Sequence, residues 1–186
     1  MSQFRRWAVL LIASALLLVP LNAKPGGYTV VAWNDLGMHC MDGDYSVFSI
    51  LPPYNTIHAQ VIDPSGKLVR TGNGITVTYQ AVGDTQGSLN QTSFWKTNFW
   101  TYAKTLFGAA LTPDTGLTGN AMPGSSNDPR PMKFESAQNW FTADGIPLTP
   151  YDDAGNKNPY AMMRISVRDA SGNVLALNRY RAAGFR

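Results

Sequence analysis

The chain of 186 residues contains one cysteine, so no disulfide can form within it and the fold depends on packing and hydrogen bonds. It has no CxxCH sequence, the motif of covalent haem attachment, and it therefore carries no covalent haem. After the N-terminal segment it has no apolar stretch of the roughly 20 residues that a helix needs to cross a bilayer. These absences exclude disulfide scaffolds, c-type cytochromes and helical membrane proteins.

Basic residues do not gather into a patch, although the formal net charge is +3 and the isoelectric point is about 9.1. Two arginines precede Trp7, and three more fall in the last eight residues. Between Lys24 and Asn178, the 12 acidic residues outnumber the 10 basic ones. Nucleic-acid recognition requires a basic surface, so we expect no nucleic-acid partner.

The first 23 residues have the form of a secretory signal peptide. Arg5 and Arg6 precede a largely apolar run over 7–19, which Pro20 ends, and Ala23 offers a small residue for cleavage. The run is too short for a membrane helix and fits a cleaved export peptide. We expect cleavage after Ala23 and a mature chain that is periplasmic or extracellular and not bound to the membrane.

The rest of the sequence indicates a β-rich fold. Residues 56–63 alternate, with Ile57, Ala59 and Val61 on one face and His58 on the other. The same criteria predict further strands, at 28–33, 45–51, 67–70, 75–82, 162–168 and 173–177. They predict a helix over 97–107 that is capped by Thr97 and stopped by Gly108, a second helical turn over 136–141, and a long ordered loop over 111–131.

This spacing favours a single domain over 24–178, an antiparallel β-sandwich of Ig-like or related type with a short helical and long-loop insertion. Residues 179–186 are rich in arginine and lack alternation, so we expect an irregular tail.

The densest chemistry lies at residues 38–41, where the only cysteine stands between methionines and beside one of two histidines. Thiolate, imidazole and thioether groups suit Cu(I), and a blue-copper site needs two histidines, a cysteine and a weak axial ligand. We therefore predict a metal site, with copper as the favoured ion, and its candidate ligands are His39, Cys40, His58, Met38, Met41 and Asp35. Adjacent side chains on an extended strand face opposite ways, so His39 and Cys40 can share a metal only if the loop bends.

Two alternatives remain open for this segment. In the first, Met38, Cys40 and Met41 are buried as a structural plug, and the chain is a metal-free binding or interaction module. In the second, Cys40 is a nucleophile paired with His58 and oriented by Asp35 or Asn34. A thiol outside the cytoplasm is easily oxidised, so we do not expect an enzyme.

Two other segments have competing interpretations. Residues 151–158 have the composition of a calcium loop but lack the closing glutamate of an EF-hand, so a turn capped by its own Asp and Asn side chains is favoured. The aromatic segment over 94–100 offers a stacking surface for a sugar, yet core packing explains it better.

Five segments together carry a resemblance to a known group: WNDLGMHCMD (33–42), FSILPPYNT (48–56), KTNFW (96–100), GIPLTPYDD (145–153) and NPYAMMR (158–164). They resemble a family of uncharacterised exported bacterial proteins, over about residues 28–177. Longer members carry CxxCH haem motifs after this domain. The resemblance implies a redox setting outside the cytoplasm and an extracytoplasmic redox protein as partner, and it assigns no residue a role. This chain departs from the longer pattern after residue 177 and lacks CxxCH.

Overall fold

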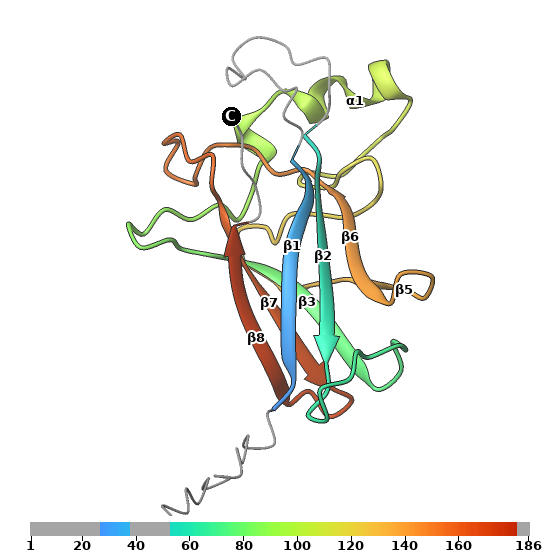
Figure 1. Ribbon diagram of the computed structural model, residues 1–186. Helices are drawn as coiled ribbons and strands as arrows, with labels where there is room; N and C mark the ends of the chain where they lie inside the picture. Colours follow the sequence, from blue (N-terminus) through green and yellow to red (C-terminus); the bar gives the residue numbers. More distant parts are fainter. Residues whose placement is uncertain (1–26, 38–52, 182–186) are drawn as a thin grey trace, which may run out of the picture.

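The described residues form eight strands in two antiparallel sheets, which pack face to face as a β-sandwich (Figure 1). The structure, a computed structural model, describes residues 27–37 and 53–181. The first sheet has the order β1-β2-β6-β5, with bounds Thr29–Gly37, Asn55–Ile62, Trp140–Ile146 and Lys133–Glu135. The second has the order β4-β3-β7-β8, with bounds Arg130–Pro131, Ile75–Val82, Met162–Asp169 and Val174–Arg181. The predicted β-sandwich is confirmed, and its Ig-like topology stays a prediction.

Strand β2 shows how the sequence sets the two faces of the first sheet. Ile57, Ala59 and Val61 are at most 1% exposed and pack in the core between the sheets, as their alternation predicted. His58 faces the opposite way, onto the outer surface of the first sheet. The second sheet contributes the other half of the core, chiefly Val77, Tyr79, Met163, Ile165 and Val167. The outer surface is therefore free to carry polar and aromatic side chains.

Helix α1 spans Phe99–Phe107, and the predicted cap at Thr97 is wrong, because Asn98 is the N-cap residue. The hydroxyl of Thr97 accepts a hydrogen bond from the Phe99 amide at 3.2 Å. The predicted stop at Gly108 is confirmed: its φ of 68° is left-handed, and its amide donates to the Lys104 carbonyl. A short 3-10 helix, η1 (Phe94–Lys96), precedes α1. Within the described ranges, no helix has both the length and the apolar character needed to cross a membrane.

The helical turn predicted over 136–141 is wrong. Residues 136–139 form the turn of a hairpin between β5 and β6, and β6 begins at Trp140. Asn139 has a φ of 57°, a left-handed conformation that asparagine tolerates in tight turns. The predicted strand over 67–70 is also reduced, to an isolated bridge between Ile62 and Leu68.

The boundary between domain and tail is corrected as well. Strand β8 continues to Arg181, so the first residues of the predicted irregular tail pair with β7. The Asn178 amide group reaches the other sheet and donates to the Val30 carbonyl at 3.0 Å. This contact explains why the strand does not end at Leu177. The predicted signal peptide and the strand predicted over 45–51 lie outside the described residues.

Candidate functional site

The site centres on a carboxylate and an imidazole that adjacent strands bring together. Trp33 of β1 stands opposite His58 of β2, and the register then shifts between Asn34 and Leu36. Asp35 is the extra residue of this β-bulge, an irregularity that redirects a side chain. Its Oδ2 lies 3.1 Å from His58 Nε2. The bulge therefore gives His58 a carboxylate partner.

The ring of His58 is held by aromatic contacts on the outer surface of the first sheet. It stacks on Trp140 with centroids 4.3 Å apart and planes 27° apart, and Trp33 lies 5.6 Å away. The residue is only 6% exposed. Because an ionised carboxylate only accepts hydrogen bonds, Nε2 carries the proton that faces Asp35. In the neutral imidazole Nδ1 then has a lone pair, and this buried atom has no hydrogen-bond partner within the described ranges.

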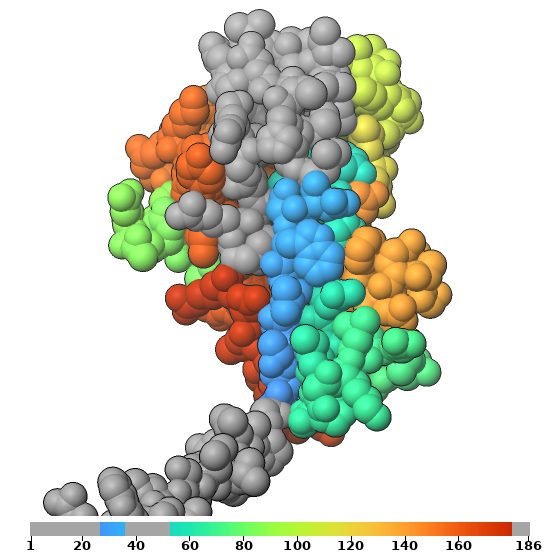
Figure 2. Space-filling view, viewed as in Figure 1, coloured from blue at the N-terminus to red at the C-terminus, as the bar shows by residue number. Residues whose placement is uncertain are grey.

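A groove of about 470 Å³ runs over the same surface. Figure 2 shows β1 in blue, β2 in teal and the β5–β6 hairpin in orange, the strands of the first sheet. The groove is lined by Asp35, Tyr54, Thr56, His58, Glu135, Gln138, Trp140, Thr142 and Asp144. Among the described residues, its lining contains three carboxylates and no lysine or arginine.

All three carboxylates have partners, and that of Asp35 is His58. Asp144 Oδ1 accepts hydrogen bonds from the Tyr54 hydroxyl at 2.6 Å and the Thr56 hydroxyl at 2.5 Å. Burial raises the pKa of Tyr54, and the Asp144 carboxylate raises it further. Glu135 pairs at the rim with the Lys133 ammonium at 2.9 Å, and the Lys133 side chain is 79% exposed.

The structure places two of the six predicted metal ligands. His58 and Asp35 are in contact, whereas Met38, His39, Cys40 and Met41 lie outside the described residues. Over 27–37 and 53–181, no three His, Cys, Asp or Glu side chains are placed to hold a metal ion together. A metal centre of three or more such ligands would therefore need ligands from outside the described residues.

Sequence reasoning missed most of the groove, because its residues come from strands that it misplaced. Trp140, Thr142 and Asp144 alternate with the buried Phe141 and Ala143. That alternation was a usable signal, and reading 136–141 as a helical turn hid it.

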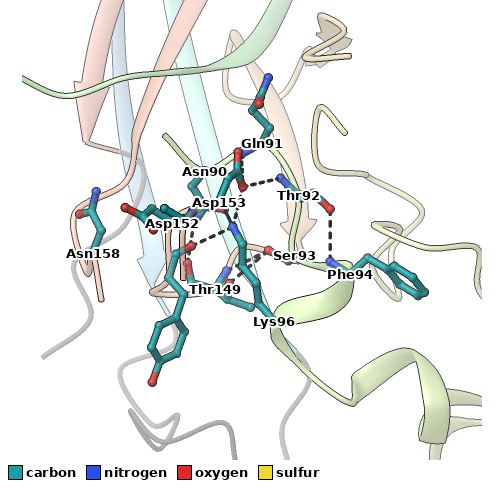
Figure 3. A network of polar contacts seen from close by, with 12 residues as sticks. Asn90, Gln91, Thr92, Ser93, Phe94, Lys96, Thr149, Asp152, Asp153 and Asn158 are labelled. Carbon is teal, nitrogen blue, oxygen red and sulfur yellow. Dashed lines mark hydrogen bonds and ion pairs between the residues drawn. The ribbon is translucent and has the colours of Figure 1, made fainter. Parts of the chain in front are cut away.

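A second polar cluster is centred on Lys96, between the loops that precede η1 and follow β6 (Figure 3). Its Nζ donates to Asn90 Oδ1 at 2.8 Å, the Tyr151 carbonyl at 2.9 Å and Asp153 Oδ1 at 2.7 Å. The Lys96 side chain is 1% exposed. Burial lowers the pKa of Lys96, and the Asp153 carboxylate opposes that shift. Because all three N–H donors of this ammonium are used within the chain, it joins the loops and has no donor left for a ligand.

The neighbouring carboxylates also hold loops together, by accepting hydrogen bonds from backbone amides. Asp153 also accepts hydrogen bonds from the Gln91 amide, and Asp114 accepts them from the Ser93 and Phe94 amides. Asp152 accepts from the Asn156 amide at 2.7 Å and closes a turn. This confirms the turn interpretation of residues 151–158.

The described residues thus form a β-sandwich with a groove on the outer surface of one sheet, lined by three carboxylates and by Trp140. Comparison of the chain with protein-family models, with curated proteins and with solved structures finds no match in any of the three. The functional argument therefore starts from the chemistry of the site.

Proposed function

We propose that the chain is an exported metal-binding or redox-accessory domain with copper as its metal, acting with a redox protein outside the cytoplasm. The observation that carries the proposal is the state of His58. Its Nε2 faces Asp35 at 3.1 Å, while its buried Nδ1 has no partner within the described ranges. Histidines that bind metals commonly donate their second ring N–H to a carboxylate, which orients the ring and makes it more basic.

The length of chain between the end of β1 and residues 38–41 allows these residues to supply ligands beside His58. Strand β1 ends at Gly37, which lies opposite Asn55, and His58 is three residues farther along β2. That separation is about 10 Å along a strand. Cys40 is three residues beyond Gly37, and three residues span at most about 11 Å. The tether is therefore long enough for Cys40 to reach His58.

The proposed ligands are His58 Nδ1 and the Cys40 thiolate, completed by His39 and by the thioether of Met38 or Met41. A bound copper ion would either take part in one-electron transfer or be held in storage. Asp35 would act through His58, by holding the imidazole in the tautomer that leaves Nδ1 free.

Copper content tests the proposal. The chain is reconstituted with Cu(I), freed of excess metal and weighed by native mass spectrometry, with the expected result of about one copper per chain. Asp35→Asn is expected to weaken copper affinity by about 10- to 100-fold. Asp128→Asn removes the same charge from an exposed residue that does not line the groove, and should leave affinity unchanged.

Cys40→Ser should abolish copper uptake while the circular dichroism spectrum of the sandwich is retained. Stoichiometric copper in a folded double variant, Cys40→Ser with His58→Ala, would contradict the proposal.

The groove favours a second candidate, a metal-free binding module. Its tryptophan, carboxylates and hydroxyls line one continuous hollow of about 470 Å³, and such concave polar and aromatic surfaces are typical of ligand sites. If this candidate is right, ligand binding persists in excess chelator and does not depend on Cys40.

A further inference from the structure

We propose that the groove on the outer surface of the first sheet binds a linear polyamine, a ligand with two or more protonated amines separated by methylene groups. This inference develops the binding-module candidate and requires neither copper nor residues 38–41. It rests on the charge of the groove, on carboxylates that do not converge on one point, and on its aromatic floor.

The lining is rich in hydrogen-bond acceptors and poor in cations. Asp35, Glu135 and Asp144 supply three carboxylates, and neither lysine nor arginine lines the groove in the part of the chain that the structure describes. The hydroxyl, amide and indole groups in the lining serve neutral ligands as well, whereas the three carboxylates repel an anion and favour a cation. Ammonium groups have three donors and no acceptor. A ligand that carries several of them matches the lining.

The spacing of the carboxylates argues for an extended cation. Within the described ranges, no three acidic or histidine side chains converge on one point where an ion could sit. A single metal ion therefore cannot engage all three groove carboxylates together. A polyamine places its charges several bonds apart and can pair with separate carboxylates along the groove.

One groove carboxylate already holds an ammonium group. Lys133 Nζ lies 2.9 Å from Glu135 Oε1, although the lysine side chain is 79% exposed. Exposed pairs of this kind contribute little stability, so a ligand ammonium can displace the lysine. Lys133 is therefore a competitor for the site, and removing it should favour the ligand.

The floor of the groove fits the methylene groups. Trp140 and His58 stack at 4.3 Å, and together they present an aromatic surface among the carboxylates. Hydrocarbon segments pack on such surfaces, and an ammonium within about 6 Å of an indole gains cation–π attraction. His58 is 6% exposed and has a ring nitrogen without a partner in the described part of the chain. The lining of the groove therefore includes a buried polar side chain whose hydrogen bonding is incomplete.

The test is a titration of the full chain with spermidine, in excess EDTA and at low ionic strength, followed by calorimetry and tryptophan fluorescence. The expected result is saturable one-to-one binding that weakens as salt is raised from about 0.02 M to about 0.2 M, because salt screens charge pairs. Maltotriose is the neutral control and should bind more weakly.

Two substitutions of opposite sign test the groove itself. Glu135→Gln is expected to weaken spermidine binding by about three- to fivefold, and Lys133→Met to strengthen it by about threefold. The matched controls are Asp128→Asn and Lys157→Gln, which make similar charge changes at exposed residues outside the groove. They should change affinity by less than about 1.5-fold.

Three results would overturn the inference: no saturable binding, equal effects in groove and control variants, or tighter binding of maltotriose than of spermidine. The gain in affinity expected of Lys133→Met cannot arise from misfolding. Because EDTA removes metal, failure of spermidine binding leaves the copper proposal standing, and failure of copper uptake leaves this one standing.

Discussion

Replacing Lys96 with methionine tests how much of the fold depends on its buried charge network. The ammonium of Lys96 is the shared donor of Asn90 Oδ1, the Tyr151 carbonyl and Asp153 Oδ1, at 2.8, 2.9 and 2.7 Å. Methionine keeps most of the side-chain volume and flexibility, so the change removes the charge and its hydrogen bonds with little loss of packing. Breaking a buried ion pair costs about 3–5 kcal/mol because the partner charge stays buried.

The lower end of that range applies here. The Asp153 side chain is 26% exposed, and it keeps hydrogen bonds from the Gln91 and Thr92 amides. Water can therefore solvate part of the orphaned carboxylate. We expect Lys96→Met to lower the free energy of unfolding by about 3 kcal/mol.

Urea denaturation followed by far-UV circular dichroism measures this change, with the m-value checked for constancy. Lys133→Met is the matched control, because Lys133 also pairs with a carboxylate, at 2.9 Å, but is 79% exposed. Its expected cost is below about 0.5 kcal/mol. Equal losses in the two variants, or a loss below about 1 kcal/mol for Lys96→Met, would refute the reasoning.

Three further predictions concern pH and close packing. Burial raises the pKa of Asp152, but hydrogen bonds, led by those from Asn156, outweigh burial and hold the pKa below the usual 3.8. Stability should therefore fall as pH drops below about 3.8, and it should fall less in Asp152→Asn. Burial raises the pKa of Tyr79 above its usual 10.0; stability should fall as pH rises past about 10, and Tyr79→Phe should flatten that loss. A Cβ on Gly116 would lie 2.1 Å from the Gly145 carbonyl oxygen, so Gly116→Ala should cost about 2–3 kcal/mol.

Each of these predictions has a control and a contrary result. Gly27→Ala adds a methyl group with nothing within 4 Å, and equal thermal stability of the two alanine variants would contradict the packing argument. Tyr79→Phe should also cost about 1–2 kcal/mol at neutral pH, since the hydroxyl donates to the Ala121 carbonyl at 2.6 Å. If stability falls with acid in Asp152→Asn, or with alkali in Tyr79→Phe, as steeply as in the unsubstituted chain, that group is not the cause of the pH dependence.

The sandwich could be predicted where alternation was uninterrupted. In β2, Ile57, Ala59 and Val61 face the core and His58 faces outward because side chains in a strand alternate strictly. The β5–β6 hairpin was missed because its turn depends on one left-handed residue, Asn139. The continuation of β8 was missed because Asn178 bonds to the opposite sheet, which no local pattern reveals.

The site was predictable only in part, for a related reason. Asp35 and His58 were both chosen as candidate ligands from residue type, and they are in contact. Their contact depends on a bulge in β1, a feature that the register of two strands decides. Trp140 and Asp144 reach the same surface from a strand more than 80 residues farther along the chain.

The central claim is that His58 binds metal through Nδ1 while Asp35 holds Nε2–H, and nitrogen NMR of the imidazoles tests it most directly. The chain has only two histidines, so His39→Gln assigns the spectrum. We expect a protonated Nε2 on His58 in the metal-free chain. On addition of one equivalent of Cu(I), we expect the large shift within the His58 ring to fall on Nδ1 and not on Nε2. An Nδ1 resonance that copper leaves unchanged, or a proton on Nδ1 in the metal-free state, would contradict it.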